Sequence, residues 1–203
     1  MTVIYLASRS PRRRELLAQI GVKFEMLLFR EGSRQDVETS EDAFPGEHAD
    51  DYVRRVARLK AEAAWQRVVM RRGLRRMPVL AADTTVALAN EMLAKPVDAA
   101  DAARMLRLLA GTRHRVLTAV AVAFEERLEM RVNESFVTIA PLDEARMEAY
   151  VASGEPFDKA GGYGIQEGAA HLVSAVDGSY TNVVGLPLCE VVEDLIALGV
   201  IHG

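Results

Sequence analysis

Runs of apolar and polar residues divide the chain into short strands and amphipathic helices. Residues Thr2–Ala7 are mostly β-branched or apolar and predict a buried first strand. Ser10 and Pro11 then supply an N-cap and a first helical residue, and Gly21 is expected to end that helix. The chain therefore opens with a strand, a tight turn and a helix N-terminus, where free backbone N–H groups and arginines can face an anion.

The same periodicities predict the remaining elements, separated by a polar loop over residues 31–47. Strands are expected at 22–29, at 78–82 with an extended continuation over 84–89, at 116–124, at 128–139 and near 171–176, and helices at 50–71, 98–111, 143–154 and 186–198. Helices and strands alternate without strict regularity. This order predicts an α/β fold with a mixed, partly antiparallel sheet flanked by helices.

Composition is that of a soluble globular protein. The 203 residues are 50% hydrophobic and 27% charged, which suits one domain or one domain with two lobes. The single cysteine, Cys189, excludes a disulfide framework and a cysteine-built zinc site, and we expect it in the core. No apolar run is long enough to span a membrane, and no basic region precedes the first apolar stretch. We expect a cytoplasmic protein with no membrane partner.

Charge argues against a nucleic acid polymer as partner, since the net charge is −4. Arginines are nevertheless clustered, at Arg12–Arg14 and again at Arg71–Arg76. A local cationic pocket on an acidic protein suits a small anionic ligand. We interpret the second cluster as a solvated face.

Asp83 is the carboxylate with the most suggestive position, because it directly follows the apolar run 79–82. α/β sheets place ligand-binding groups at the ends of buried strands. Asp83 could hold a divalent cation or accept a proton from water. It could equally cap the strand through Thr84 or Thr85, and its position alone does not decide between these roles.

Two other sets of residues could contact a ligand. Lysine occurs only four times, and Lys60, Lys95 and Lys159 lie beside other candidate residues; a lysine is a compact charge suited to phosphate oxygens. The glycine-rich stretch 158–166 allows close approach of backbone to ligand and ends in Gln166, whose amide can read the edge of a base. We interpret His114 and His171 as structural.

Taken in order, these motifs resemble the Maf family of nucleoside triphosphate pyrophosphatases, historically called septum formation inhibitors. The resemblance covers Val3 to about Val191. It is carried by Leu6-Ala-Ser-Arg-Ser-Pro-Arg-Arg13 with Glu15-Leu-Leu, Ala82-Asp-Thr84, Lys95-Pro96, Gly111 with His114 and Thr118, Asp158-Lys-Ala-Gly-Gly-Tyr-Gly-Ile-Gln166 and Val184-Gly-Leu-Pro187.

The resemblance implies a fold of the Maf and inosine-triphosphatase type, an elongated mixed sheet flanked by helices with two lobes around a central cleft. Residues 1–203 would form this single domain. It also implies cleavage between the α and β phosphates of a nucleoside triphosphate with the help of Mg²⁺ or Mn²⁺. Residues 158–166 match the motif of the branch that hydrolyses dTTP and UTP.

The resemblance also implies roles for individual residues. Asp83 corresponds to the proposed general base. Arg12, Thr84 and Gln166 correspond to positions linked to base choice, and Ser8, Arg13, Lys60 and Lys95 to the phosphate-contacting set. The family usually carries acidic residues shortly after the second strand. Here Glu31 is the acidic residue in that region, so Asp83 and Glu31 are the predicted metal ligands.

Three hypotheses follow. The first is a house-cleaning enzyme that hydrolyses dTTP and UTP. The second is a regulator of cell division that is not an enzyme, as the historical family name suggests. The third is the same reaction on other nucleotides, such as 7-methyl-GTP or modified pyrimidine nucleotides. A homodimer is among the arrangements that the sequence allows, but the sequence does not fix the oligomeric state.

Overall fold

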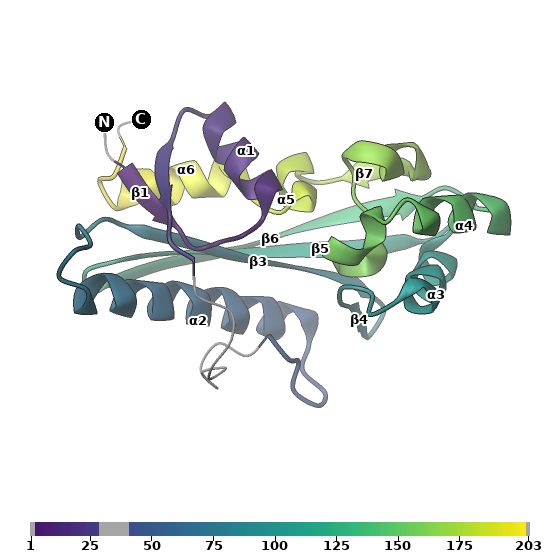
Figure 1. Ribbon diagram of the computed structural model, residues 1–203, viewed down its shortest axis with the longest axis horizontal. Coiled ribbons are helices and arrows are strands. Elements are labelled where there is room, and N and C mark those ends of the chain that lie inside the picture. The colour runs from purple at the N-terminus through teal and green to yellow at the C-terminus, as the bar shows by residue number, and fades with distance from the viewer. Residues whose placement is uncertain (1–2, 29–40, 202–203) are drawn as a thin grey trace. The chain divides into compact units, whose positions relative to one another are not determined.

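The computed structural model describes residues 3–28 and 41–201, apart from the side chain of Glu167. This part of the chain contains a seven-stranded sheet with helices packed on it (Figure 1). Its strands are β1 (Val3–Leu6), β2 (Lys23–Met26), β3 (Val79–Leu88), β4 (Glu91–Leu93), β5 (Arg113–Phe124), β6 (Arg127–Ile139) and β7 (Val173–Asp177). They are arranged in the order β2-β1-β3-β5-β6-β7, and β4 pairs with β3.

The predicted helices are present, and several shorter ones accompany them. The α-helices are α1 (Pro11–Gln19), α2 (Ala49–Met70), α3 (Ala99–Leu109), α4 (Glu144–Ala152), α5 (Tyr180–Val184) and α6 (Leu188–Ala197). Three single-turn or two-turn 3₁₀ segments are η2 (Glu155–Asp158), η3 (Ala160–Gly162) and η4 (Glu167–Leu172). The sequence pattern missed α5 and the 3₁₀ segments because elements this short show no apolar periodicity.

The strand pairing confirms the predicted mixed sheet. Strand β1 runs parallel to both β2 and β3, whereas β4 is antiparallel to β3 and β7 is antiparallel to β6. Strands β5 and β6 are neighbours joined by the two residues Glu125 and Glu126, which makes them a hairpin. Glu125 has a positive φ of 56°, as the tight turn requires.

The chain forms two compact units. Unit 1 comprises Met1–Asp83, Thr118–Val132 and Gly185–Gly203, and unit 2 comprises Thr84–Leu117 and Asn133–Val184. Strands β3, β5 and β6 each pass from one unit to the other. The predicted single domain with a cleft between two lobes stays a prediction.

In unit 1, the strands are covered by α2 on one side and by α1 and α6 on the other (Figure 1). Helix α2 buries a stripe that includes Val53, Val56, Ala57 and Val68, at the three- and four-residue spacing of an amphipathic helix. Small alanines in the same stripe allow the helix to approach the sheet closely. Lys60 lies on this helix, so the packing of α2 fixes where its side chain begins.

In unit 2, α3 and α4 are each started by an aspartate and share one apolar cluster. The Asp98 carboxylate accepts a hydrogen bond from the backbone N–H of Asp101, and Asp143 does the same for Arg146, both at 2.8 Å. The buried cluster beneath the two helices includes Met105, Leu106, Leu109, Met147, Tyr150 and Tyr163. Tyr163 belongs to the glycine-rich stretch, so this stretch is anchored in the core of unit 2.

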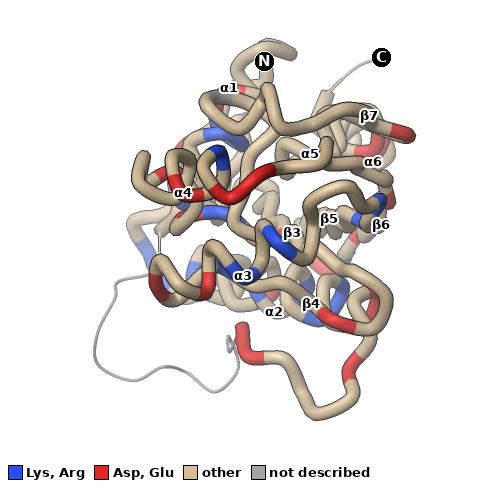
Figure 2. The backbone as a smooth tube through the Cα atoms, turned by 90° about the vertical axis from the view of Figure 1, so that its right-hand side faces the viewer, with Lys and Arg blue, Asp and Glu red and all other residues tan. Residues whose placement is uncertain are grey.

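Charged residues of both signs are interspersed along the elements (Figure 2). No helix among the described residues is long and apolar enough to cross a membrane. The expectation for Cys189 was wrong, because this residue is exposed. Helix α6 buries Val191 and Leu195, and Cys189 lies two positions before Val191, on the opposite side of the helix.

Candidate functional site

Asp83 lies in the middle of β3, and not at the end of a strand as its position after the apolar run 79–82 predicted. The β-branched Thr84, Thr85 and Val86 prolong the strand to Leu88. The neighbouring strand β1, however, pairs with β3 only as far as Leu80. Asp83 therefore lies just beyond the end of β1, at the sheet edge where ligand-binding groups are expected. It is 7% exposed.

Lys60 joins Asp83 to a second carboxylate. The Lys60 Nζ donates to Asp83 Oδ1 at 2.8 Å and lies 2.9 Å from Glu41 Oε1. Both lysine and aspartate side chains are mostly buried, whereas Glu41 is 59% exposed. The predicted metal ligand Glu31 lies outside the described residues. Among the described residues, Glu41 is the acidic side chain that reaches Lys60 alongside Asp83.

Two side chains of α2 hold Glu41 in place. The Tyr52 hydroxyl donates to the backbone oxygen of Glu41 at 2.9 Å. Arg55 donates to the Asp42 carbonyl at 2.9 Å and forms a bidentate ion pair with Glu47, at 2.7 Å for both bonds. Burial raises the pKa of Tyr52, and the carboxylates of Asp83 and Glu41 raise it further. Tyr52 therefore stays a neutral donor beside the carboxylates.

The turn between β1 and α1 forms a compact hydrogen-bonded unit around Arg13. Its Nη1 donates to Ser8 Oγ at 3.2 Å and to the Ala82 carbonyl at 2.8 Å, and its Nε donates to the Gly185 carbonyl at 2.8 Å. Ser10 caps α1, since its Oγ accepts from the Arg13 backbone N–H at 3.4 Å. Arg13 thus ties the start of α1 to the residue that precedes Asp83.

Burial lowers the pKa of the Arg13 guanidinium, and attraction to the Asp83 carboxylate opposes this change. The Arg13 side chain is therefore a positive charge held close to Asp83 by two backbone carbonyls. Arg12 is the second residue of α1 and is half-buried. Unit 1 therefore brings the Asp83 carboxylate together with the cations around it, since it contains Ser8, Arg12, Arg13, Lys60 and Asp83.

Unit 2 brings the other two motifs together. The Gly161 N–H donates to the Ala94 carbonyl at 3.1 Å, next to Lys95. Gly161 and Gly162 have positive φ values of 73° and 70°, and a Cβ atom at these positions would lie 3.0 Å from Val86 and 3.1 Å from Pro96. Only glycine permits both this backbone conformation and this close approach. Close packing and backbone conformation therefore explain the two adjacent glycines of the motif.

The side chains of Lys95 and Gln166 remain available for a ligand. Lys95 is exposed, and Gln166 is half-buried at the start of η4. Neither side chain has a hydrogen-bond or ion-pair partner within the described residues. Gln166 therefore does not hold the glycine-rich stretch together through its amide. Thr84 is the third predicted site residue in unit 2. It is half-buried on β3 and interacts with neighbouring groups.

Lys159 and His114 have structural partners. The Lys159 Nζ donates to the Glu155 carbonyl at 2.8 Å and to Asp158 Oδ1 at 2.7 Å, and Lys159 is 7% exposed. His114 Nε2 lies 2.6 Å from the Tyr163 hydroxyl. Burial lowers the pKa of His114 to about 4, so it is neutral near pH 7. Both contacts fix the conformation of the glycine-rich stretch.

His171 was expected inside a strand, but it is exposed in η4, and β7 begins only at Val173. Its Nδ1 lies 2.6 Å from the Gly168 carbonyl. Neither histidine belongs to a metal cluster, and no group of three His, Cys, Asp or Glu residues in the described ranges could hold a metal ion by itself.

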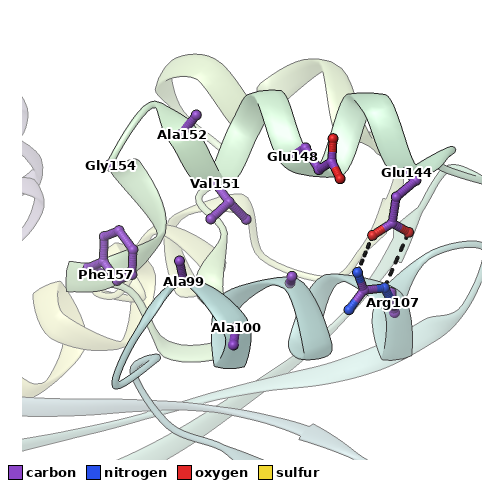
Figure 3. A pocket seen from close by; sticks show the side chains of 10 residues that line it. Ala99, Ala100, Arg107, Glu144, Glu148, Val151, Ala152, Gly154 and Phe157 are labelled. Carbon is purple, nitrogen blue, oxygen red and sulfur yellow. Dashed lines mark hydrogen bonds and ion pairs between the residues drawn. The ribbon is translucent and has the colours of Figure 1, made fainter.

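A hollow of about 610 Å³ lies between α3 and α4 in unit 2 (Figure 3). Ala99, Ala100, Val151 and Phe157 line it, and an ion pair between Arg107 and Glu144 closes one end. None of the predicted site residues lines this hollow. Its charged lining residues are Arg107, Glu144 and Glu148, and the rest of the lining is apolar or glycine.

The fold and the site together define a class of protein: a mixed-sheet α/β protein with a buried carboxylate, surrounded by cations, just beyond the end of the parallel strand β1. Comparison with known proteins identifies the family. The chain belongs to the Maf family, since the family model described as "Maf-like protein" matches residues 3–198.

Curated relatives match over nearly their full length. A "dTTP/UTP pyrophosphatase" of Cupriavidus metallidurans is 53% identical over 93% of each chain. Another of the same name, from Aromatoleum aromaticum, is 51% identical over 97% of this chain and 95% of the relative. Among solved structures, the Ham1 protein of Staphylococcus aureus matches 68% of this chain and 72% of its own, at 15% identity and a TM-score of 0.37.

Proposed function

We propose that this protein hydrolyses dTTP and UTP to the nucleoside monophosphate and pyrophosphate. The observation that carries the proposal is the arrangement around Asp83: a buried carboxylate 2.8 Å from the Lys60 ammonium, directly after a carbonyl bound by Arg13. In the reaction, one water is consumed and the phosphoanhydride bond between the α and β phosphates breaks. The two nucleotides, dTTP and UTP, are those in the names of the relatives.

Asp83 is the group that accepts the proton of the attacking water, because a general base must lie within hydrogen-bond reach of the water and be fixed there. Lys60 and Arg13 supply positive charge close to Asp83, where phosphate oxygens gather negative charge during cleavage. Ser8 orients the Arg13 guanidinium through a 3.2 Å hydrogen bond. Arg12 adds a further charge at the first turn of α1, which itself favours anions.

We propose Asp83 and Glu41 as the residues that hold a divalent cation, with Glu31 retained as a candidate from the sequence. The donors fit a hard metal ion: two carboxylates lie within 3 Å of the same ammonium, so a cation is already stabilised between them. Mg²⁺ and Mn²⁺ commonly use one or two carboxylates together with substrate phosphates. When bound, such an ion would neutralise phosphate charge and polarise the scissile bond.

Unit 2 supplies recognition in this proposal. Lys95 contacts phosphate in this proposal. Its side chain is exposed and has no ion-pair partner in the described chain, so its ammonium group can pair with a phosphate oxygen. Gln166 pairs with the base, because an amide offers one donor and one acceptor side, as the edge of uracil or thymine does. Thr84, together with Arg12 of unit 1, is the other residue assigned to base choice. A site that accepts both dTTP and UTP cannot depend on the 2′-hydroxyl.

We also propose that the protein works in the cytoplasm, where a lone exposed cysteine stays reduced. A homodimer stays a prediction, and sedimentation of the purified chain tests it.

A nucleotide panel tests the proposed activity. The purified chain is incubated with dTTP, UTP, ATP and 7-methyl-GTP, each with Mg²⁺ or Mn²⁺, and the products are separated by anion exchange. We expect monophosphate and pyrophosphate from dTTP and UTP, with the other nucleotides much poorer. Diphosphate with orthophosphate as products, or a preference for 7-methyl-GTP, would contradict the proposal.

A further inference from the structure

A second, smaller hollow in unit 1 lies away from the residues discussed above. Its volume is about 370 Å³. Val3 of β1, Phe124 at the end of β5, and Leu198 and Val200 after α6 supply apolar walls, and Arg75 and Arg76 supply the polar side. All these residues belong to unit 1. The hollow thus combines an aromatic and aliphatic wall with a pair of guanidinium groups.

The hollow lies at the start of β3, whereas Asp83 lies at the middle of that strand. Pro78, which lines it, directly precedes β3, and Asp83 is the fifth residue of that strand. At about 3.3 Å per residue, the two positions are roughly 16 Å apart. A mononucleotide bound at Asp83 therefore does not also occupy this hollow.

The charge beside the hollow is unusual for this protein. Between Glu62 and Asp83 the chain has no acidic residue and five arginines. Arg71, Arg72, Arg75 and Arg76 are all exposed, and no ion pair of their side chains is found within the described residues.

Seven other arginines of the described residues are paired with carboxylates. Arg55, Arg104, Arg107, Arg113, Arg115, Arg127 and Arg131 each form an ion pair with a carboxylate. The Arg71–Arg76 segment therefore concentrates positive charge that the rest of the described chain does not compensate, on a protein whose net charge is −4.

We infer that this hollow is a second ligand site, and that it binds a small organic phosphate. Guanidinium groups form a fork that matches phosphate oxygens and are weakly hydrated, so they suit a phosphate at the rim of an apolar hollow. The walls at Phe124 and Leu198 accept the apolar or aromatic body of the ligand. Pockets for small ligands are commonly about 300–1,000 Å³, so the hollow suits a mononucleotide-sized molecule better than a polymer.

The structure contains its own reporter of occupancy. Trp65 is the single tryptophan of the chain. Its ring packs edge-on against Phe124, with ring centroids 5.8 Å apart and planes at 70°. A ligand in contact with Phe124 changes the environment of this pair, so tryptophan fluorescence reports binding at the hollow without any turnover.

Two charge-matched variants test the site. Arg75→Ala/Arg76→Ala removes the guanidinium groups that line the hollow, and Arg71→Ala/Arg72→Ala removes the same charge from the same segment outside it. Thymidine monophosphate is the probe, followed by tryptophan fluorescence and by equilibrium dialysis. Inorganic phosphate and thymidine, titrated separately, measure the contribution of each half of the probe.

We expect the wild type and the Arg71/Arg72 variant to bind one more probe molecule per chain than the Arg75/Arg76 variant. The affinity for this additional molecule should exceed that for phosphate or thymidine alone by tenfold or more. Hydrolysis of dTTP should be similar in all three proteins. Because the readout needs no turnover, failure of the proposed activity would be seen separately.

Other outcomes would overturn the inference. Equal stoichiometry in the two variants would show that the arginine pair binds nothing specific. Equal affinity for inorganic phosphate and the nucleotide would exclude the apolar wall from the site. An effect of Arg75→Ala/Arg76→Ala on binding to anionic vesicles or single-stranded DNA, with none on thymidine monophosphate, would assign the segment to a membrane or a nucleic acid instead.

Discussion

Asp83 is the residue on which the proposed chemistry depends most directly. Asp83→Asn keeps an acceptor for the Lys60 ammonium, which is also paired with Glu41. We therefore expect a folded protein whose kcat on dTTP falls by roughly 10²–10⁴-fold, the usual scale for loss of a general base. Asp177→Asn, at an exposed ion pair with Arg113, serves as the control and should leave kcat unchanged. Near-normal turnover of a well-folded Asp83→Asn protein would mean that Asp83 serves only as the structural partner of Lys60.

Lys95 and Gln166 separate phosphate handling from base recognition. Lys95→Ala should lower kcat/KM on every nucleotide alike, since a phosphate contact carries no base information. Gln166→Ala should lower kcat/KM for dTTP and UTP by roughly 5- to 150-fold, corresponding to about 1–3 kcal/mol for a lost buried hydrogen bond, and change GTP little. The measurement is kcat/KM for the three nucleotides in both variants.

Lys23→Ala is the control for the lysine, because Lys23 is an exposed lysine on β2, away from the motifs. Equal losses on all three nucleotides for Gln166→Ala would mean that the amide supports the local fold. The structure argues against that role, since the Gln166 side chain forms no hydrogen bond with the described residues.

At the scale of elements, the glycine-rich stretch is fixed by close packing. Gly161→Ala places a Cβ 3.0 Å from Val86 at a φ of 73°, whereas Gly21→Ala has nearly the same φ, 71°, and open space around it. We expect Gly161→Ala to destabilise the fold by about 1–3 kcal/mol more than Gly21→Ala, as overpacking commonly does. Urea unfolding of both variants measures the difference.

The same substitution should also reduce discrimination between dTTP and GTP. Gly161 is five residues before Gln166, and its N–H is bonded beside Lys95. A displaced backbone here moves both recognition residues. If Gly161→Ala and Gly21→Ala proved equally stable and equally selective, the packing of η3 would not position the site.

Element boundaries and candidate residues were predictable to different degrees. Helix α2 and the β5–β6 hairpin follow from strong periodicity, and Asp83, Lys60 and Gln166 could be proposed from their motifs. Glu41 could not be predicted, because its register depends on Tyr52 and Arg55, tertiary contacts that leave no repeating pattern in the loop. An acidic residue shortly before Pro45-Gly46 was the available signal. The continuation of β3 beyond Asp83 was visible only as an extended segment.

At the scale of the whole molecule, burial of His114 links stability to pH. Its pKa is lowered from 6.5 to about 4 in the folded protein. The unfolded chain therefore binds a proton at a higher pH than the folded chain does. This contribution is fully present above about pH 6.5 and is lost as the pH falls toward 4. The full difference corresponds to on the order of 3 kcal/mol.

His114→Gln tests this linkage, because glutamine does not titrate and can still bond the Tyr163 hydroxyl. We expect the free energy of unfolding of the wild type to fall more steeply between pH 6.5 and pH 4 than that of His114→Gln. Urea titrations at four pH values across this range give both slopes. Parallel slopes would mean that His114 is protonated as readily in the folded protein as in the unfolded chain.

The passage of β3, β5 and β6 from one unit to the other has a consequence for how such a protein can change over time. Unit 1 is assembled from three separate stretches and unit 2 from two. No single cut in the gene releases either unit intact, so neither can be copied, lost or fused to another protein as a module. The candidate site residues of unit 1, such as Asp83 and Lys60, and those of unit 2, such as Lys95 and Gln166, are therefore inherited together. A new ligand preference must arise by substitutions within this one framework.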